Sequence, residues 1–118
     1  MPSTTRYRRG DIVLVAFPFT DLSSTKRRPA LVVSPDHFND HLQDLVLAAI
    51  TSQVAVEDTL IIEPADCVDG ILPKRSALRV GKIFTINSSL VLKKLCALRA
   101  HKTDDVLCAM RAFFSSDV

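Results

Sequence analysis

Short apolar runs of strand length, separated by polar segments, recur along this chain. Residues 12–17 and 30–34 are rich in β-branched side chains, which favour extended backbone. Residues 45–51 form a third run, too short between its polar flanks for a helix, and residues 59–63 form a fourth that is polar at its ends. These runs predict strands, which restricts the chain to folds built around a β-sheet.

The second half of the chain adds weaker strand patterns. Residues 76–86 alternate around Gly81, which predicts a strand with a bulge or bend. A short stretch at residues 95–98 adds one more strand. Residues 36–43 are polar and fit either a short helix or a loop.

The clearest helix pattern is at the C-terminal end. Thr103 is predicted to cap the helix, with Asp104 and Asp105 in the first turn near the positive end of the dipole. An apolar stripe at helical spacing, which we expect to pack on the sheet, comprises Val106, Leu107, Met110, Phe113 and Phe114. Short consecutive strands and one terminal helix predict a mostly β fold (β+α), either a compact antiparallel barrel or a strongly curled sheet.

Length and composition narrow the class of protein. At 118 residues we expect one domain over 1–118. No apolar run approaches the roughly 18 residues of a membrane span, and the N-terminus lacks a signal-peptide pattern, so we expect a cytoplasmic protein without membrane contact. Three widely spaced cysteines, Cys67, Cys96 and Cys108, predict reduced and mostly buried thiols.

Charge is unevenly distributed although its formal net value is only +2. Basic residues cluster at 6–9, 26–28, 74–79 and 93–94, whereas acidic residues concentrate at 36–44 and 57–69. This segregation fits a face that binds a polyanion, and it also fits ordinary solvated surface.

Two strand ends carry groups suited to phosphate chemistry. Pro29 restricts the backbone of Arg28 to extended geometry at the mouth of a strand, which favours a bidentate guanidinium–phosphate contact. The third run ends in Thr51-Ser52-Gln53, and Thr51 would lie near Arg28 if the two strands pair. The alternatives are a surface arginine in a basic turn and a polar strand end.

A competing pattern is a metal site. His37 and His41 are four residues apart, which would place both imidazoles on one helix face, with aspartates nearby as oxygen ligands. A solvated polar loop explains the same residues more simply, and we predict no metal.

Several segments together resemble the MazF/PemK toxins of type II toxin–antitoxin systems, in the PemK-like branch. They are GDIVLV (10–15), FPFTD (17–21), RPALVVS (28–34), AITSQ (49–53) and KIFTI (82–86). The resemblance extends to the C-terminal helix and therefore covers nearly the whole chain. One departure is Phe84, where many relatives carry a second arginine; it could stack on a base or belong to the core.

The resemblance implies an SH3-like barrel, shared with CcdB-type gyrase poisons, that forms a homodimer with RNA across the subunit interface. It also implies a cognate antitoxin and identifies Arg28 and Thr51 as the catalytic pair. The implied reaction, which needs no cofactor, is attack of a ribose 2′-hydroxyl on the adjacent phosphate, leaving a 2′,3′-cyclic phosphate and a 5′-hydroxyl. A guanidinium gives up its proton reluctantly, so Arg28 suits charge stabilisation better than base catalysis.

The leading hypothesis is thus a metal-independent endoribonuclease that cleaves single-stranded RNA. The flanking residues expected to contact RNA are Phe19, Thr20, Lys26, Arg27, Ser52, Gln53 and Lys82. The alternatives are a toxin of the same fold that binds a protein such as DNA gyrase without cutting RNA, and a catalytically silent relative that binds an antitoxin.

Overall fold

The computed structural model describes residues 6–17, 26–54 and 57–117. Seven strands form one antiparallel sheet in the order β4-β6-β3-β2-β1-β7-β5. The strands are β1 (Asp11–Phe17), β2 (Lys26–Val32), β3 (Asp44–Thr51), β4 (Thr59–Ile62), β5 (Cys67–Val68), β6 (Ser76–Asn87) and β7 (Val91–Leu98). The helices are α1 (Asp36–Leu42) and α2 (Ala100–Ser115), with short 3-10 turns η1 (Pro64–Asp66) and η2 (Ser88–Leu90).

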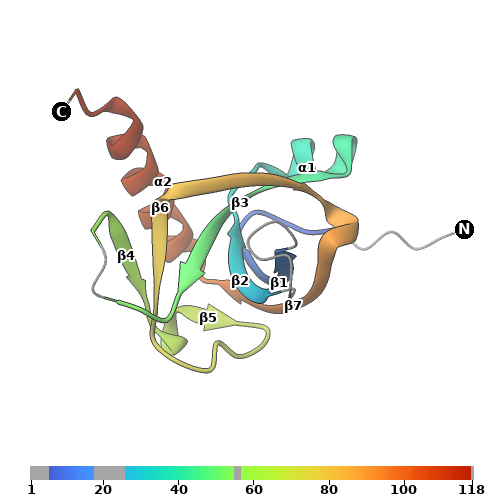
Figure 1. Ribbon diagram of the computed structural model, residues 1–118, viewed down its shortest axis with the longest axis horizontal. Coiled ribbons are helices and arrows are strands. Elements are labelled where there is room, and N and C mark those ends of the chain that lie inside the picture. The colour runs from blue at the N-terminus through green and yellow to red at the C-terminus, as the bar shows by residue number, and fades with distance from the viewer. Residues whose placement is uncertain (1–5, 18–25, 55–56, 118) are drawn as a thin grey trace, which may run out of the picture.

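The sheet is strongly curled, so that β1, β2, β3, β6 and β7 wrap around a common centre (Figure 1). One buried cluster, which includes Val13, Val15 and Leu47, lies on one face of the strands. The other cluster includes Ile12 and Leu31 and extends to Val106 of α2. Because side chains alternate along each strand, one curled sheet can supply both clusters. The predicted mostly β fold with a terminal helix is confirmed.

The starts of two strands differ from the sequence prediction, and strand pairing explains both. β2 begins at Lys26 rather than at residue 30, because residues 26–31 pair with β1. Pro29 therefore lies inside a strand, but at a position where β2 has not yet begun to pair with β3. β7 begins at Val91 rather than at residue 95 because it pairs along β1. The sequence fitted either a helix or a loop at residues 36–43, and the structure has the helix α1 there.

The predicted cap of α2 is wrong. The helix begins at Ala100, and Thr103 lies within its first turn, where its hydroxyl donates to the Arg99 carbonyl at 3.2 Å. The Arg99 N–H donates to the Asp66 carbonyl at 2.8 Å, so contacts from η1, distant in sequence, determine where β7 ends and the helix starts. The apolar stripe is partly confirmed: Val106 is fully buried, whereas Phe114 is 67% exposed.

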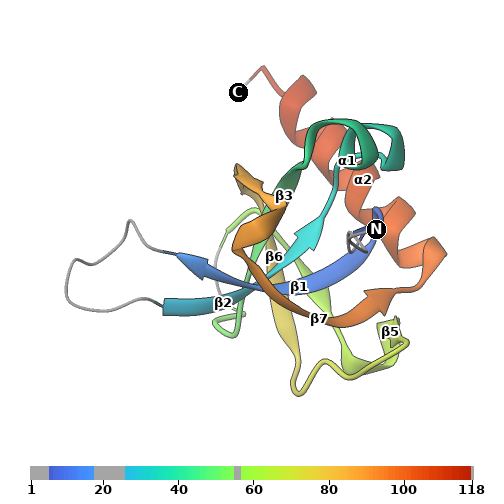
Figure 2. The same ribbon diagram turned by 90° about the vertical axis from the view of Figure 1, so that its right-hand side faces the viewer.

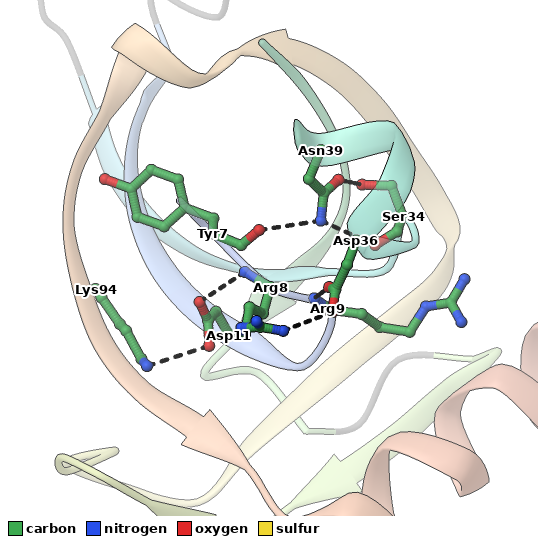
Figure 3. Close-up of polar contacts among 8 residues, drawn as sticks. All are labelled: Tyr7, Arg8, Arg9, Asp11, Ser34, Asp36, Asn39 and Lys94. Atoms are coloured by element: carbon green, nitrogen blue, oxygen red, sulfur yellow. Dashed lines mark hydrogen bonds and ion pairs between the residues drawn. The ribbon is translucent and has the colours of Figure 1, made fainter. Parts of the chain in front are cut away.

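A group of polar residues ties the N-terminal segment to α1 and β7 (Figure 3). This N-terminal network consists of Tyr7, Arg8, Arg9, Asp11, Ser34, Asp36, Asn39 and Lys94. Asp36 accepts from the Arg8 guanidinium and the Arg9 N–H, both at 2.9 Å. The almost fully buried Asp11 accepts from the Arg8 N–H at 2.9 Å and pairs with Lys94 at 3.2 Å. These basic residues are thus occupied in holding the fold together.

Candidate active site

Arg28 and Thr51 lie where β2 and β3 separate. The last pair between the two strands is Ala30 with Ala49, and two residues further along each strand are Arg28 and Thr51. Arg28 stays paired with Val15 of β1, which holds its backbone in the sheet while its other side is free of β3. In Figure 2, β1 and β2 extend together beyond the rest of the sheet. Arg28, the third residue of β2 and not its end as predicted, and Thr51, the last residue of β3, thus lie on unpaired sides of the two strands.

A bulge in β6 lies opposite Ala49, two residues before Thr51, which itself pairs with Ala77. Ala48 pairs with Ile83 and Ile50 pairs with Leu78, so that Arg79, Val80, Gly81 and Lys82 stand opposite Ala49 alone. This confirms the irregularity predicted at Gly81. A Cβ at Gly81 would lie 3.0 Å from Cζ of Phe113, so α2 packs directly on the bulge. Bulges of this kind often re-aim side chains beside functional sites.

Two cavities meet at Arg28, Ile50 and Thr51, which line both. The larger, of about 390 Å³, we call the apolar cavity; its apolar lining is Leu14, Pro29, Ile50, Leu72, Pro73 and Leu95. The smaller, of about 230 Å³, we call the cationic cavity; Arg79 and Lys82 of the bulge line it together with Gln53. The separated strands and the β6 bulge thus produce one continuous site with two chemically different sides.

The site is strongly cationic. Its six site cations are Arg27, Arg28, Lys74, Arg79, Lys82 and Lys93. Within the described part of the chain, neither cavity is lined by a carboxylate or an imidazole, and no site cation forms an ion pair, although Arg79 and Lys82 also line a neighbouring cavity together with Glu57 and Asp58. Positive charge without a protein counterion is the arrangement expected for an anionic ligand.

The hydroxyl of Thr51 is oriented by its neighbour. Its oxygen accepts a hydrogen bond from the Gln53 N–H at 3.1 Å. That bond occupies a lone pair and leaves the hydroxyl hydrogen available to donate. Arg28 and Thr51 are therefore both hydrogen-bond donors that line the same two cavities.

The structure brings together most of the residues predicted for the site. Arg27 and Ser52 line the apolar cavity, and Gln53 and Lys82 line the cationic cavity. Phe19 and Thr20 lie outside the described residues, and Lys26 is placed only as the first residue of β2. Sequence reasoning missed Lys74, Arg79 and Lys93 as site residues, although all three stand in basic clusters that it recorded.

Other candidate groups have structural explanations. Nδ1 of His41 hydrogen-bonds the His37 carbonyl at 2.8 Å, and the described residues contain no group of three or more potential ligands for a metal ion. Phe84 packs against the cluster around Val13, which supports the core interpretation. Cys67 and Cys96 are buried free thiols, as predicted, whereas Cys108 is exposed; burial raises the pKa of Cys96 to about 12, which makes it a poor nucleophile.

A larger cavity of about 560 Å³ lies between α2 and the β4–β6 region. Asp58 lines it, and the described residues around it include no cation. Its charge does not suit an anionic ligand, so the site at Arg28 and Thr51 is the better candidate. Among the described helices, none has the length and apolar character to cross a membrane.

Comparison with solved structures gives the same fold. An endoribonuclease in complex with its cognate antitoxin, from a mycobacterial species, matches with a TM-score of 0.76 and 16% identity, covering 98% of this chain and 99% of its own. Mycobacterium tuberculosis toxin MazF-mt6 matches with a TM-score of 0.71 and 19% identity, covering 92% and 99%. MazF from Deinococcus radiodurans matches with a TM-score of 0.71 and 16% identity, covering 96% and 100%.

A search of curated proteins finds no match. The model of one protein family, described as the PemK-like, MazF-like toxin of type II toxin–antitoxin systems, matches residues 8–114. That match spans both strand ends, the β6 bulge and α2, and this chain therefore belongs to the PemK-like, MazF-like toxins of type II toxin–antitoxin systems.

Proposed function

We propose that this toxin is an endoribonuclease that cleaves single-stranded RNA, with Arg28 and Thr51 as its catalytic pair. The observation that carries the proposal is that these two residues, on different strands, line the same two cavities among six cations. A single strand fits better than a duplex, because apolar walls beside cations suit an unstacked base next to its phosphate.

The proposed reaction is an intramolecular transesterification. The ribose 2′-oxygen bonds to the adjacent phosphorus and loses its proton, while the bond to the 5′-oxygen of the next nucleotide breaks and that oxygen takes up a proton. The nucleophile belongs to the substrate, so no metal-activated water is required. Arg28 stabilises negative charge on the phosphorane, and Thr51 donates its hydroxyl hydrogen to a phosphate oxygen. With no carboxylate or imidazole among the described lining, positioning and charge stabilisation carry the rate.

Partners follow from the same proposal. We infer that this toxin binds a cognate antitoxin, a proposal supported by the antitoxin-bound structure of a similar endoribonuclease. From the family alone, we further infer that the toxin acts as a homodimer in the cytoplasm. Arg27, Ser52, Gln53 and Lys82 are proposed RNA contacts beside the catalytic pair, from their places in the two cavities.

The test is cleavage of a single-stranded RNA by the purified protein in EDTA. We expect fragments with 2′,3′-cyclic phosphate and 5′-hydroxyl ends, and no cleavage where the nucleotide at the cut carries 2′-deoxyribose. Arg28→Ala should lose at least about a hundredfold in rate while unfolding at the same temperature. Full activity in Arg28→Ala, or cleavage at the 2′-deoxy position, would refute the mechanism.

A further inference from the structure

We propose that the apolar cavity is a nucleobase subsite, and that it selects the base next to the cut. This inference rests on the proposed function and adds to it which part of the RNA the site recognises, namely the nucleobase beside the scissile bond. The cationic cavity, by contrast, holds the sugar–phosphate backbone on the other side of the Arg28–Thr51 pair.

The two cavities differ in polarity: one has a largely apolar lining, which suits a base, and the other has a largely cationic lining, which suits a phosphate. The apolar cavity is lined by buried Ile50 and Leu72, by partly buried Leu14 and Leu95, and by cations that are exposed, namely Arg27, Arg28, Lys74 and Lys93. The cationic cavity is smaller, and its described lining outside the shared residues is mainly Arg79, Lys82 and Gln53. A planar base gains by leaving water for the apolar lining, whereas a phosphate gains by contact with cations.

Residues 70–76 form one wall of the apolar cavity, to which they contribute Leu72, Pro73, Lys74 and Ser76. Contacts at both ends of this segment hold it in place. Gly70 has a φ of +143°, and a Cβ there would lie 2.0 Å from the Leu95 carbonyl oxygen, which accepts from the Ile71 N–H at 3.2 Å. Leu72 then inserts into the core at 3% exposure. The Ser76 hydroxyl donates to the Lys74 carbonyl at 3.0 Å, which holds the C-terminal end of this segment. A wall fixed before the ligand arrives can discriminate between ligands of similar size.

The charged groups around this cavity are all hydrogen-bond donors. Arg27, Lys74 and Lys93 can donate to a base edge but cannot accept, and no carboxylate lines the cavity within the described residues. On the edge that faces the major groove in a duplex, guanine (N7 and O6) and uracil (O4) present only acceptors, which would find partners there, whereas adenine and cytosine each present an amino group on that edge that would find no charged acceptor. We therefore infer a preference for guanine or uracil in this subsite.

The experiment compares cut sites made by the wild type and two cavity variants. A pool of RNA with a randomised segment is digested in EDTA, and the 5′ ends of the fragments are sequenced. Lys74→Ala removes a donor at the rim, and Leu95→Phe fills part of the cavity. Arg75→Ala is the matched control, because Arg75 is the adjacent cation but pairs with Glu63 at 3.1 Å and does not line the cavity.

We expect wild-type cuts to share guanine or uracil at one position beside the scissile bond. Lys74→Ala and Leu95→Phe should weaken that preference about tenfold or more, and Arg75→Ala should leave it unchanged. Wild-type cutting with an unaltered preference in both cavity variants would place base recognition elsewhere. A preference for adenine or cytosine at that position, lost in Lys74→Ala, would overturn the inferred donor-based choice.

A second measurement separates failure of this inference from failure of the proposed function. Binding of fluorescent oligonucleotides with 2′-deoxyribose at every position needs no cleavage. If the wild type cuts no RNA yet binds guanine- or thymine-containing strands more tightly, and Lys74→Ala abolishes that difference, the subsite stands and the nuclease assignment fails. If these variants bind all strands like the wild type but lose affinity for the antitoxin, the cavity is a protein-docking site and the base subsite is refuted.

Discussion

The N-terminal network and the cavity site use the same kinds of side chain in opposite ways. In the network, Arg8 pairs with Asp36 at 2.9 Å, and Lys94 pairs with buried Asp11 at 3.2 Å. In the cavity site, six cations lie along two cavities without a carboxylate in the described lining. Paired charges hold elements of a fold in place, whereas unpaired ones keep their attraction for a ligand. Arg8 and Lys94 thus differ from the six site cations in forming ion pairs with carboxylates.

Arg28→Lys should have the largest effect in this comparison. It keeps the charge but loses the planar fork of donors, and we expect RNA cleavage to fall about a hundredfold with unchanged thermal stability. Arg8→Lys is the control in the network and should leave the cleavage rate unchanged. Rates are measured on one RNA under single-turnover conditions. Equal rates for Arg28→Lys and the wild type would show that charge alone matters at the site.

Asp11→Ala should have the opposite effect to Arg28→Lys: it should lower the stability of the fold and leave RNA cleavage unchanged. The Arg8 N–H would lose its acceptor and Lys94 its partner, so we expect the free energy of unfolding to fall by about 2 kcal/mol and the melting temperature by about 8 °C. RNA cleavage well below that temperature should be unchanged. Asp11→Asn, which keeps an acceptor for the Arg8 N–H, should lose less. Thermal unfolding followed by circular dichroism measures both, and a stable but inactive Asp11→Ala would place the network in the site.

The salt dependence of RNA binding should distinguish the two kinds of cation. Each phosphate contact contributes a slope of about 0.7 to the logarithm of affinity against that of salt, so Lys82→Ala should lower the slope by about 0.7. Arg8→Ala should not change it, because the Arg8 guanidinium already pairs with Asp36 at 2.9 Å. Titrations with a 2′-deoxy-blocked RNA at several salt concentrations provide the slopes. Identical slopes for Lys82→Ala and the wild type would show that Lys82 does not contact a phosphate.

The smallest effect concerns pH. The Arg9 N–H bond and the adjacent Arg8 guanidinium hold the pKa of Asp36 below its usual range. A carboxyl with a lowered folded pKa stabilises the fold above its unfolded pKa, and this contribution disappears as pH falls through the folded value. Because Asp36 is about half exposed, we expect less than about 1 kcal/mol. Asp36→Asn should therefore unfold with a weaker pH dependence below about pH 5; an unchanged acid profile would contradict this.

Local patterns in the sequence predicted much of the fold. The β-branched runs became β1, β2 and β3, and Gly81 marked the β6 bulge, because alternation and glycine position are properties of a few adjacent residues. The cap of α2 was mispredicted because its start depends on the Arg99–Asp66 contact, which joins residues far apart in sequence. The early start of β2 likewise depends on its pairing with β1.

The site was predictable only in part for the same reason. The resemblance carried by the RP and TSQ segments identified Arg28 and Thr51, which the structure brings to shared cavities. Lys74 joins them because Gly70 and Ile71 lie against β7 at Leu95, and Lys93 joins them because β7 pairs with β1 opposite Leu14. No pattern of adjacent residues in the sequence predicts these contacts between distant segments.

The early end of the β2–β3 ladder has an evolutionary consequence. Backbone pairing stops at Ala30 and Ala49, so the side chains beyond that point can be exchanged without disturbing the hydrogen bonds of these two strands. A lineage can thus alter what its toxin recognises while its architecture persists. In agreement, this chain shares its fold with solved structures at only 16–19% identity.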